Sequence, residues 1–81
     1  MQYYINSIEQ IIQDGKLKEY GGTEKVADLN PAMNKYYTKL ANVSADIGEN
    51  HTYMSIKIVN SYGVTVKEDT VGNYLEELST E

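Results

Sequence analysis

One amphipathic pattern in the middle of the chain constrains the fold more than any other feature. Apolar side chains recur every three to four residues across residues 31–47, which predicts a helix with one apolar face. Asn30 suits the N-cap position and Pro31 the first helical position, while Gly48 is a typical residue just beyond a helix end. A helix with one apolar face must cover another apolar surface, and the flanking segments have to supply it.

The segment that follows the helix predicts a β-hairpin. Apolar and polar side chains alternate across residues 53–58, so one face of this strand is apolar and the other polar. Residues 64–67 repeat the alternation. Between them, residues 61–63 suit a three-residue turn in which Gly63 adopts the left-handed conformation.

The predicted turn fixes a register for this hairpin. It pairs Ile58 with Val66 on the core face and Lys57 with Lys67 on the outer face. Two lysines opposite each other are mildly unfavourable. Either the register therefore differs, or one of the two acids that follow the second lysine compensates for the repulsion.

The N-terminal third of the chain contains the strongest short hairpin signal, Asp14-Gly15. This signal predicts one strand near residues 2–13 and a second near residues 16–27. The apolar residues of the first segment also fall at helical spacing, and Gly15 could follow a helix as its C-terminal cap. Periodicity alone slightly favours that helix over a strand.

These elements combine into an α+β domain with the order ββαββ, or α–β–αββ if the first segment is a helix. The favoured fold is a four-stranded, mainly antiparallel sheet with one helix on one face. Gly21-Gly22 predicts a bulge or a break within the second strand. The predicted core consists of Met33, Tyr37, Leu40, Ile47, Met54, Ile56, Ile58, Val64 and Val66.

Charge is distributed unevenly along the chain. The 81 residues carry a net charge of −5. Residues 1–67 are neutral overall, while residues 68–81 hold five acids and no lysine. We therefore expect a single domain, 1–81, in which 73–81 form an acidic appendage. Tyr74, Leu75 and Leu78 lie at helical spacing, so this appendage is either a short helical turn or an extended segment.

The composition disfavours an enzyme, a cofactor or a metal site. There is no cysteine, which removes disulfides, thiol nucleophiles and thiolate zinc sites. His51 is the one histidine, and with Glu49 and Asp46 it would make a poor metal site. No apolar run is long enough to span a membrane and no signal peptide is visible, so we expect a cytoplasmic protein. The absence of arginine and the negative charge count against nucleic-acid binding.

Four pieces of the sequence form a characteristic layout: Tyr3-Tyr4-Ile5, Asp14-Gly15, Ala32 with Tyr36-Tyr37-Thr38-Lys39-Leu40-Ala41, and Tyr53 to Lys67. This layout resembles small uncharacterised proteins of phages and mobile elements in low-GC Gram-positive bacteria. The resemblance implies a strand for the first segment and implies no activity. It suggests a bacterial host in which short acidic proteins bind host proteins, including as inhibitors of defence systems.

We therefore expect a non-enzymatic protein that binds a host protein through its open sheet face, an edge strand or its acidic end. An inhibitor of a host nucleic-acid enzyme, with carboxylates in place of phosphates, is the sharpest form of this hypothesis. A homodimer formed through the uncovered sheet face is one alternative. A single-stranded nucleic-acid binder that uses the outer face of the sheet is another. The candidate partner-binding residues are Glu68, Asp69, Tyr74, Glu76, Glu77, Tyr53, Lys57 and Lys67.

Overall fold

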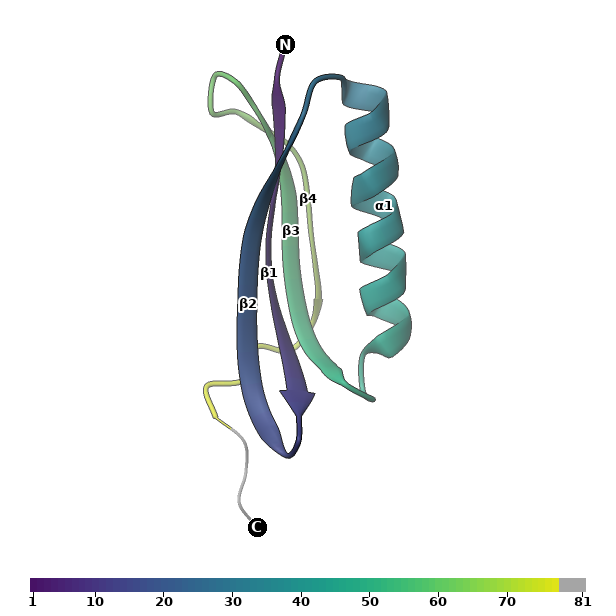
Figure 1. Ribbon diagram of the computed structural model, residues 1–81, viewed down its shortest axis with the longest axis vertical. Coiled ribbons are helices and arrows are strands. Elements are labelled where there is room, and N and C mark those ends of the chain that lie inside the picture. The colour runs from purple at the N-terminus through teal and green to yellow at the C-terminus, as the bar shows by residue number, and fades with distance from the viewer. Residues whose placement is uncertain (78–81) are drawn as a thin grey trace.

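A computed structural model describes residues 1–77 and contains one sheet and one helix. All neighbouring strands are antiparallel, in the order β2-β1-β3-β4, and the helix lies on one face of the sheet (Figure 1). The predicted ββαββ fold is confirmed. The elements are β1 (Tyr3–Gln13), β2 (Lys16–Val26), α1 (Leu29–Asp46), β3 (His51–Asn60) and β4 (Thr65–Gly72).

The first segment is a strand, so the alternative of an N-terminal helix is wrong. Asp14 and Gly15 have φ angles of 54° and 74°, as a two-residue hairpin turn requires. β1 then lies between β2 and β3, and pairing on both sides outweighs the helical spacing of its apolar residues. The bulge or break predicted at Gly21-Gly22 is also wrong, because β2 pairs with β1 residue by residue along its whole length.

Helix α1 begins slightly earlier than the sequence pattern predicts. Asp28 is the N-cap residue, so Asn30 and Pro31 fall within the first turn and the prediction of Asn30 as N-cap is wrong. At the other end Ile47 is the C-cap, and Gly48 follows with a φ of 93°. The helix packs chiefly on β3 and β1. No helix within residues 1–77 is both long and apolar enough to cross a membrane.

The core lies between α1 and the two central strands. Its fully buried members are Ile5, Ala32, Tyr36, Val43, Met54, Ile56 and Ile58. Three of these were predicted (Met54, Ile56 and Ile58), and three more predicted residues (Met33, Leu40 and Ile47) are partly buried against the core. Three predicted core residues are wrong: Tyr37 is 46% exposed, Val64 57% and Val66 43%. On the helix, Tyr36 points into the core, and Tyr37 contacts its ring edge-on from outside.

A register shift in β4 explains the misplaced Val66, whereas Val64 lies before β4, at the exposed end of the hairpin. The β3–β4 pairing slips between Ile58 and Val59, so that Val66 is the extra residue on β4. Beyond this bulge Ile58 pairs with Lys67, and Lys57 pairs with Glu68. The predicted register is therefore wrong, and the bulge replaces a contact between two lysines by a contact between opposite charges.

Candidate functional site

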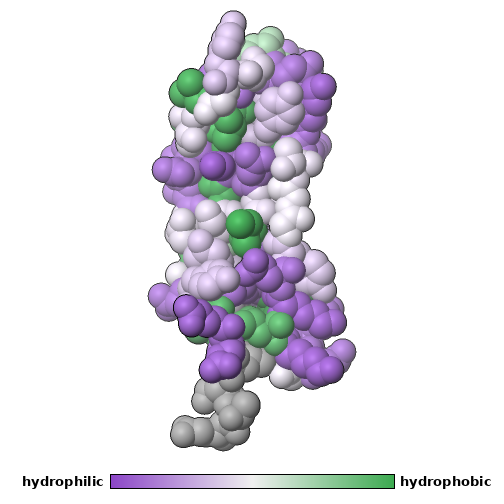
Figure 2. Space-filling model, turned by 90° about the vertical axis from the view of Figure 1, so that its left-hand side faces the viewer, coloured by the Kyte–Doolittle hydropathy of each residue, from purple (hydrophilic) through white to green (hydrophobic). Residues whose placement is uncertain are grey.

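In the part of the chain that the structure describes, the sheet face opposite α1 carries no helix, and we call it the outer face. Figure 2, which looks onto it, shows a largely hydrophilic surface with small, separate hydrophobic spots. One exposed apolar residue here is Ile8, 46% exposed, whose neighbours on the flanking strands are Gly21 and Ser55. Among residues 1–77, no continuous apolar patch therefore marks this face as the buried surface of a tight dimer.

At one end of the outer face the chain folds back over the sheet after β4. Gly72 has a φ of 75°, and a Cβ on this residue would overlap the Thr52 carbonyl oxygen. The next residue, Asn73, donates its backbone N–H to that same oxygen at 2.9 Å. The turn directs residues 73–77 across the strands toward β2 (Figure 1). We call these residues the docked segment.

The docked segment is held by a buried glutamine of β1. Gln10 is only 2% exposed although it lies on the outer face. Its side-chain oxygen accepts the Leu75 N–H at 2.9 Å, and its side-chain nitrogen donates to the Leu75 carbonyl at 2.7 Å. Thr52 also donates its hydroxyl to the Gln10 oxygen at 3.2 Å. One amide thus satisfies both backbone groups of a segment that has no strand partner.

Tyr74 adds an aromatic contact and a hydrogen bond. Its ring meets that of Tyr53 edge-on, with the centroids 5.3 Å apart. Its hydroxyl donates to the Glu19 carboxylate at 3.0 Å, and this hydrogen bond raises the pKa of Tyr74. Residues 73–77 form no helical turn, and Leu78 lies outside the described residues. Glu76 and Glu77 follow as exposed residues.

Negative charge gathers at the end of the molecule where the docked segment lies. The β1–β2 turn, the α1–β3 connection and the docked segment all lie there (Figure 1). Among residues 1–77 they bring together a group that we call the acidic end: Asp14, Glu19, Asp46, Glu49, Glu76 and Glu77. Near this group, the described part of the chain has two lysines, Lys16 and Lys18 at the start of β2. Sequence reasoning placed the charge in residues 68–81 and missed the contribution of Asp14, Asp46 and Glu49, because these residues are distant along the chain.

The eight predicted partner-binding residues do not form one site. Tyr53, Tyr74, Glu76 and Glu77 lie together at the docked segment. The structure places Lys57 and Glu68 opposite each other, farther along the outer face.

The other two residues, Lys67 and Asp69, lie on the helix side of the sheet. Tyr36 donates its hydroxyl to Asp69, and the Lys67 Nζ lies 3.8 Å from the same carboxylate. Burial and this hydrogen bond raise the pKa of Tyr36 well above its ordinary value. The prediction that Lys57 and Lys67 share the outer face is therefore wrong for Lys67.

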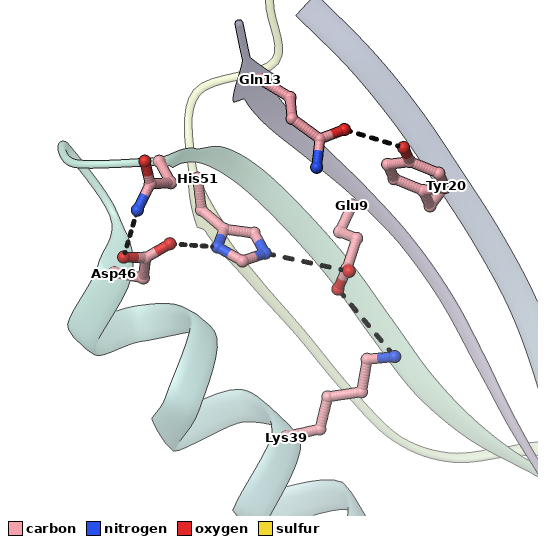
Figure 3. A network of polar contacts seen from close by, with 7 residues as sticks. Glu9, Gln13, Tyr20, Lys39, Asp46 and His51 are labelled. Atoms are coloured by element: carbon pink, nitrogen blue, oxygen red, sulfur yellow. Dashed lines mark hydrogen bonds and ion pairs between the residues drawn. The ribbon is translucent and has the colours of Figure 1, made fainter.

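A second polar cluster surrounds His51 on the helix side (Figure 3). The Nδ1 atom of His51 lies 2.6 Å from an Asp46 carboxylate oxygen, and this hydrogen bond lowers the pKa of Asp46. The Nε2 atom is buried and has no hydrogen-bond partner, and the nearest Glu9 oxygen is 3.8 Å away. Lys39 completes the row at 3.9 Å from Glu9. The cluster thus links the end of α1, the start of β3 and the middle of β1.

The His51 cluster borders an open groove of about 550 Å³ between α1 and the sheet. Ile5 and Val43 contribute apolar surface to the groove, and charged side chains such as Glu24 and Lys35 line it as well. Within residues 1–77 no three His, Cys, Asp or Glu side chains are grouped to hold a metal ion. Only one carboxylate faces the free nitrogen of His51, and this donor set is short of a typical zinc site.

Comparisons of the chain with known protein families, with curated proteins and with solved structures found no match.

Proposed function

We propose that this chain is a non-enzymatic protein-binding module that docks its acidic end on a basic surface of another protein. The observation that carries the proposal is the way the docked segment is fixed. Gln10 and Tyr74 hold the backbone just before Glu76 and Glu77, so these carboxylates start from a defined place beside Glu19.

Fixing this segment matters because binding costs conformational entropy. A free acidic tail would have to be ordered at the moment of binding, whereas the docked segment is already ordered on the sheet. The charge at one end also orients the molecule as it approaches a basic surface, which raises the rate of association.

A basic protein surface suits this charge pattern better than the two alternative partners. The outer face offers separate hydrophobic spots in place of the continuous apolar surface that a face-to-face dimer would bury (Figure 2). Single-stranded nucleic acid needs exposed aromatic rings and cationic side chains. Here Tyr53 is already in contact with Tyr74, and the end that holds this pair is acidic.

A basic surface that normally receives phosphates is the most specific partner of this kind. Carboxylates and phosphates are both acceptors of charge-assisted hydrogen bonds from lysine and arginine. An inhibitor of a host nucleic-acid enzyme is one case of this proposal.

The test is a comparison of two charge reversals in capture of proteins from a bacterial lysate. Glu76→Lys with Glu77→Lys alters the acidic end, while Asp28→Lys with Glu68→Lys makes the same change in charge elsewhere on the surface. We expect the wild type to capture basic proteins that heparin displaces, the first variant to lose them, and the second to keep them. Equal capture by the wild type and the first variant would contradict the proposal, as would capture that heparin does not affect.

A further inference from the structure

Within residues 1–77, the free edge of β2 is a second surface that has no partner. The sheet has two edges, β2 and β4. β4 is short and is bulged at Val66. In contrast, β2 runs for 11 residues and pairs with β1 without any shift of register. A long, regular edge strand is a ready template for another strand.

The direction of the backbone groups along β2 follows from the hairpin. Ile12 donates its N–H to Asn50 on the β3 side, so the odd-numbered residues of β1 bond to β2. Their partners on β2 are the even-numbered residues, starting with Lys16 opposite Gln13. The odd-numbered residues from Leu17 to Lys25 therefore direct their N–H and C=O groups to the free edge. Gly21 is the middle residue of this strand.

This edge is complementary to a second copy of itself. When two β2 strands pair antiparallel over their full length, Gly21 lies opposite Gly21 of the second copy. In that register Lys18 lies opposite Glu24 of the second copy, and the twofold axis makes this contact occur twice. All four side chains of these two contacts lie on the helix side of the sheet. The even-numbered residues of β2 face that side, because Glu24 pairs with Ile5 of the core and side chains alternate along a strand.

The same register also matches side-chain sizes. Tyr20 is 46% exposed and lies opposite Gly22 of the second copy. In the single chain its hydroxyl donates to Gln13 of β1 in an exposed hydrogen bond (Figure 3), and in the dimer its ring would turn toward the second copy. The space above Gly22 is open, since a Cβ there would meet no atom within 4 Å. An aromatic ring opposite a glycine on an antiparallel neighbour covers the exposed backbone and stabilises the pair.

We propose that two copies of this chain associate along β2, antiparallel and centred on Gly21, to form one continuous sheet. Edge lysines usually prevent such pairing. In this register Lys18 finds an acid, and neither of the other β2 lysines lies opposite a lysine. The association leaves the docked segment and the outer face uncovered, and because the strands are antiparallel it places the two acidic ends at opposite ends of the dimer.

Two single charge reversals and their mixture test this inference by sedimentation over a range of concentrations. The wild type should pass from one chain to two as its concentration rises. Lys18→Glu alone and Glu24→Lys alone each create two repulsive contacts, and each should weaken association on the order of tenfold or more. An equimolar mixture should regain the dimer, because in the mixed pair both contacts again join opposite charges.

The melting temperature of each variant serves as the control for folding. Glu24→Lys also removes an ion pair with Lys35, at 2.6 Å, between two well-exposed side chains, so its fold should remain stable. A wild type that stays monomeric at every concentration would overturn the proposal. A dimer that neither variant weakens, or a mixture that does not recover, would overturn it too.

Discussion

The two faces of the sheet are covered in different ways. On the helix side, Met54, Ile56 and Ile58 pack under α1 in a continuous apolar layer. On the outer face, a short segment is held by one buried amide, one pair of tyrosines and one glycine turn. The two faces are therefore stabilised differently. On the helix side the stability is spread over many apolar side chains, whereas the position of the docked segment depends on a few contacts between particular residues.

The largest expected effect is on the helix side. Ile56→Ala removes a fully buried side chain from the centre of the core and should lower the free energy of unfolding by about 2–5 kcal/mol. For a domain of this size each kcal/mol lowers the melting temperature by roughly 4–8 °C. Thermal denaturation followed by circular dichroism measures the change.

Ile8→Ala is the matched control on the outer face. It should cost about 1 kcal/mol, well below the loss from Ile56→Ala, because this isoleucine is 46% exposed. Equal losses in the free energy of unfolding from Ile56→Ala and Ile8→Ala would contradict the conclusion that the core lies on the helix side.

The next effect is expected at the turn into the docked segment. Gly72→Ala forces a Cβ against the Thr52 carbonyl at a positive φ, and should cost roughly 3 kcal/mol unless residues 73–77 detach. Hydrogen exchange at Leu75 distinguishes these two outcomes, because detachment exposes its amide. Gly48→Ala has a similar φ but open space, and should cost about 1–2 kcal/mol while leaving the exchange of Leu75 unchanged. Unchanged stability and exchange in Gly72→Ala would contradict the turn geometry.

A smaller effect is expected from the buried amide itself. Gln10→Ala leaves the N–H and C=O of Leu75 without partners and should cost about 1–3 kcal/mol, or release the segment to water. Near-ultraviolet circular dichroism should also change, since the contact between Tyr53 and Tyr74 depends on docking. Asn6→Ala removes an exposed hydrogen bond from the same strand and should change neither quantity. Unchanged stability and an unchanged near-ultraviolet spectrum in Gln10→Ala would show that the amide does not hold the docked segment.

The smallest effect concerns acid pH and the end of α1. The hydrogen bond from His51 lowers the pKa of Asp46 below its ordinary value of 3.8, so folding favours the ionised carboxylate. This contribution to stability is complete well above pH 3.8 and is lost as the pH falls through the lower pKa of the folded state. In Asp46→Asn and in His51→Gln the free energy of unfolding, measured by denaturation at a series of acid pH values, should therefore fall less steeply as the pH is lowered. An acid transition as steep in either variant as in the wild type would contradict this.

Local signals in the sequence predicted the helix and the turns of both hairpins. Asp14-Gly15 and Gly63 each require a positive φ at a turn, and the periodicity of residues 31–47 needs no information from elsewhere in the chain. The same local reasoning failed at Val66. A bulge changes which face each later residue occupies, and nothing in the sequence of β4 marks its position.

The candidate site was less predictable because it is assembled from distant residues. Gln10 is one of several polar residues in β1, where Asn6, Ser7, Glu9 and Gln13 are the others, and its partner Leu75 is 65 residues away along the chain. Tyr74 was predicted as a candidate partner-binding residue, but its own partners Tyr53 and Glu19 follow only from the strand order. The acidic end likewise depends on the topology that brings Asp14, Asp46 and the docked segment together.

Hydrogen exchange at the Leu75 amide, measured by NMR in the wild type and in Gln10→Ala, tests the central claim that residues 73–77 are held against the outer face. The account predicts slow exchange in the wild type, close to that of the neighbouring strand amides, and fast exchange in the variant. Exchange in the wild type at the rate of an unstructured peptide would contradict it.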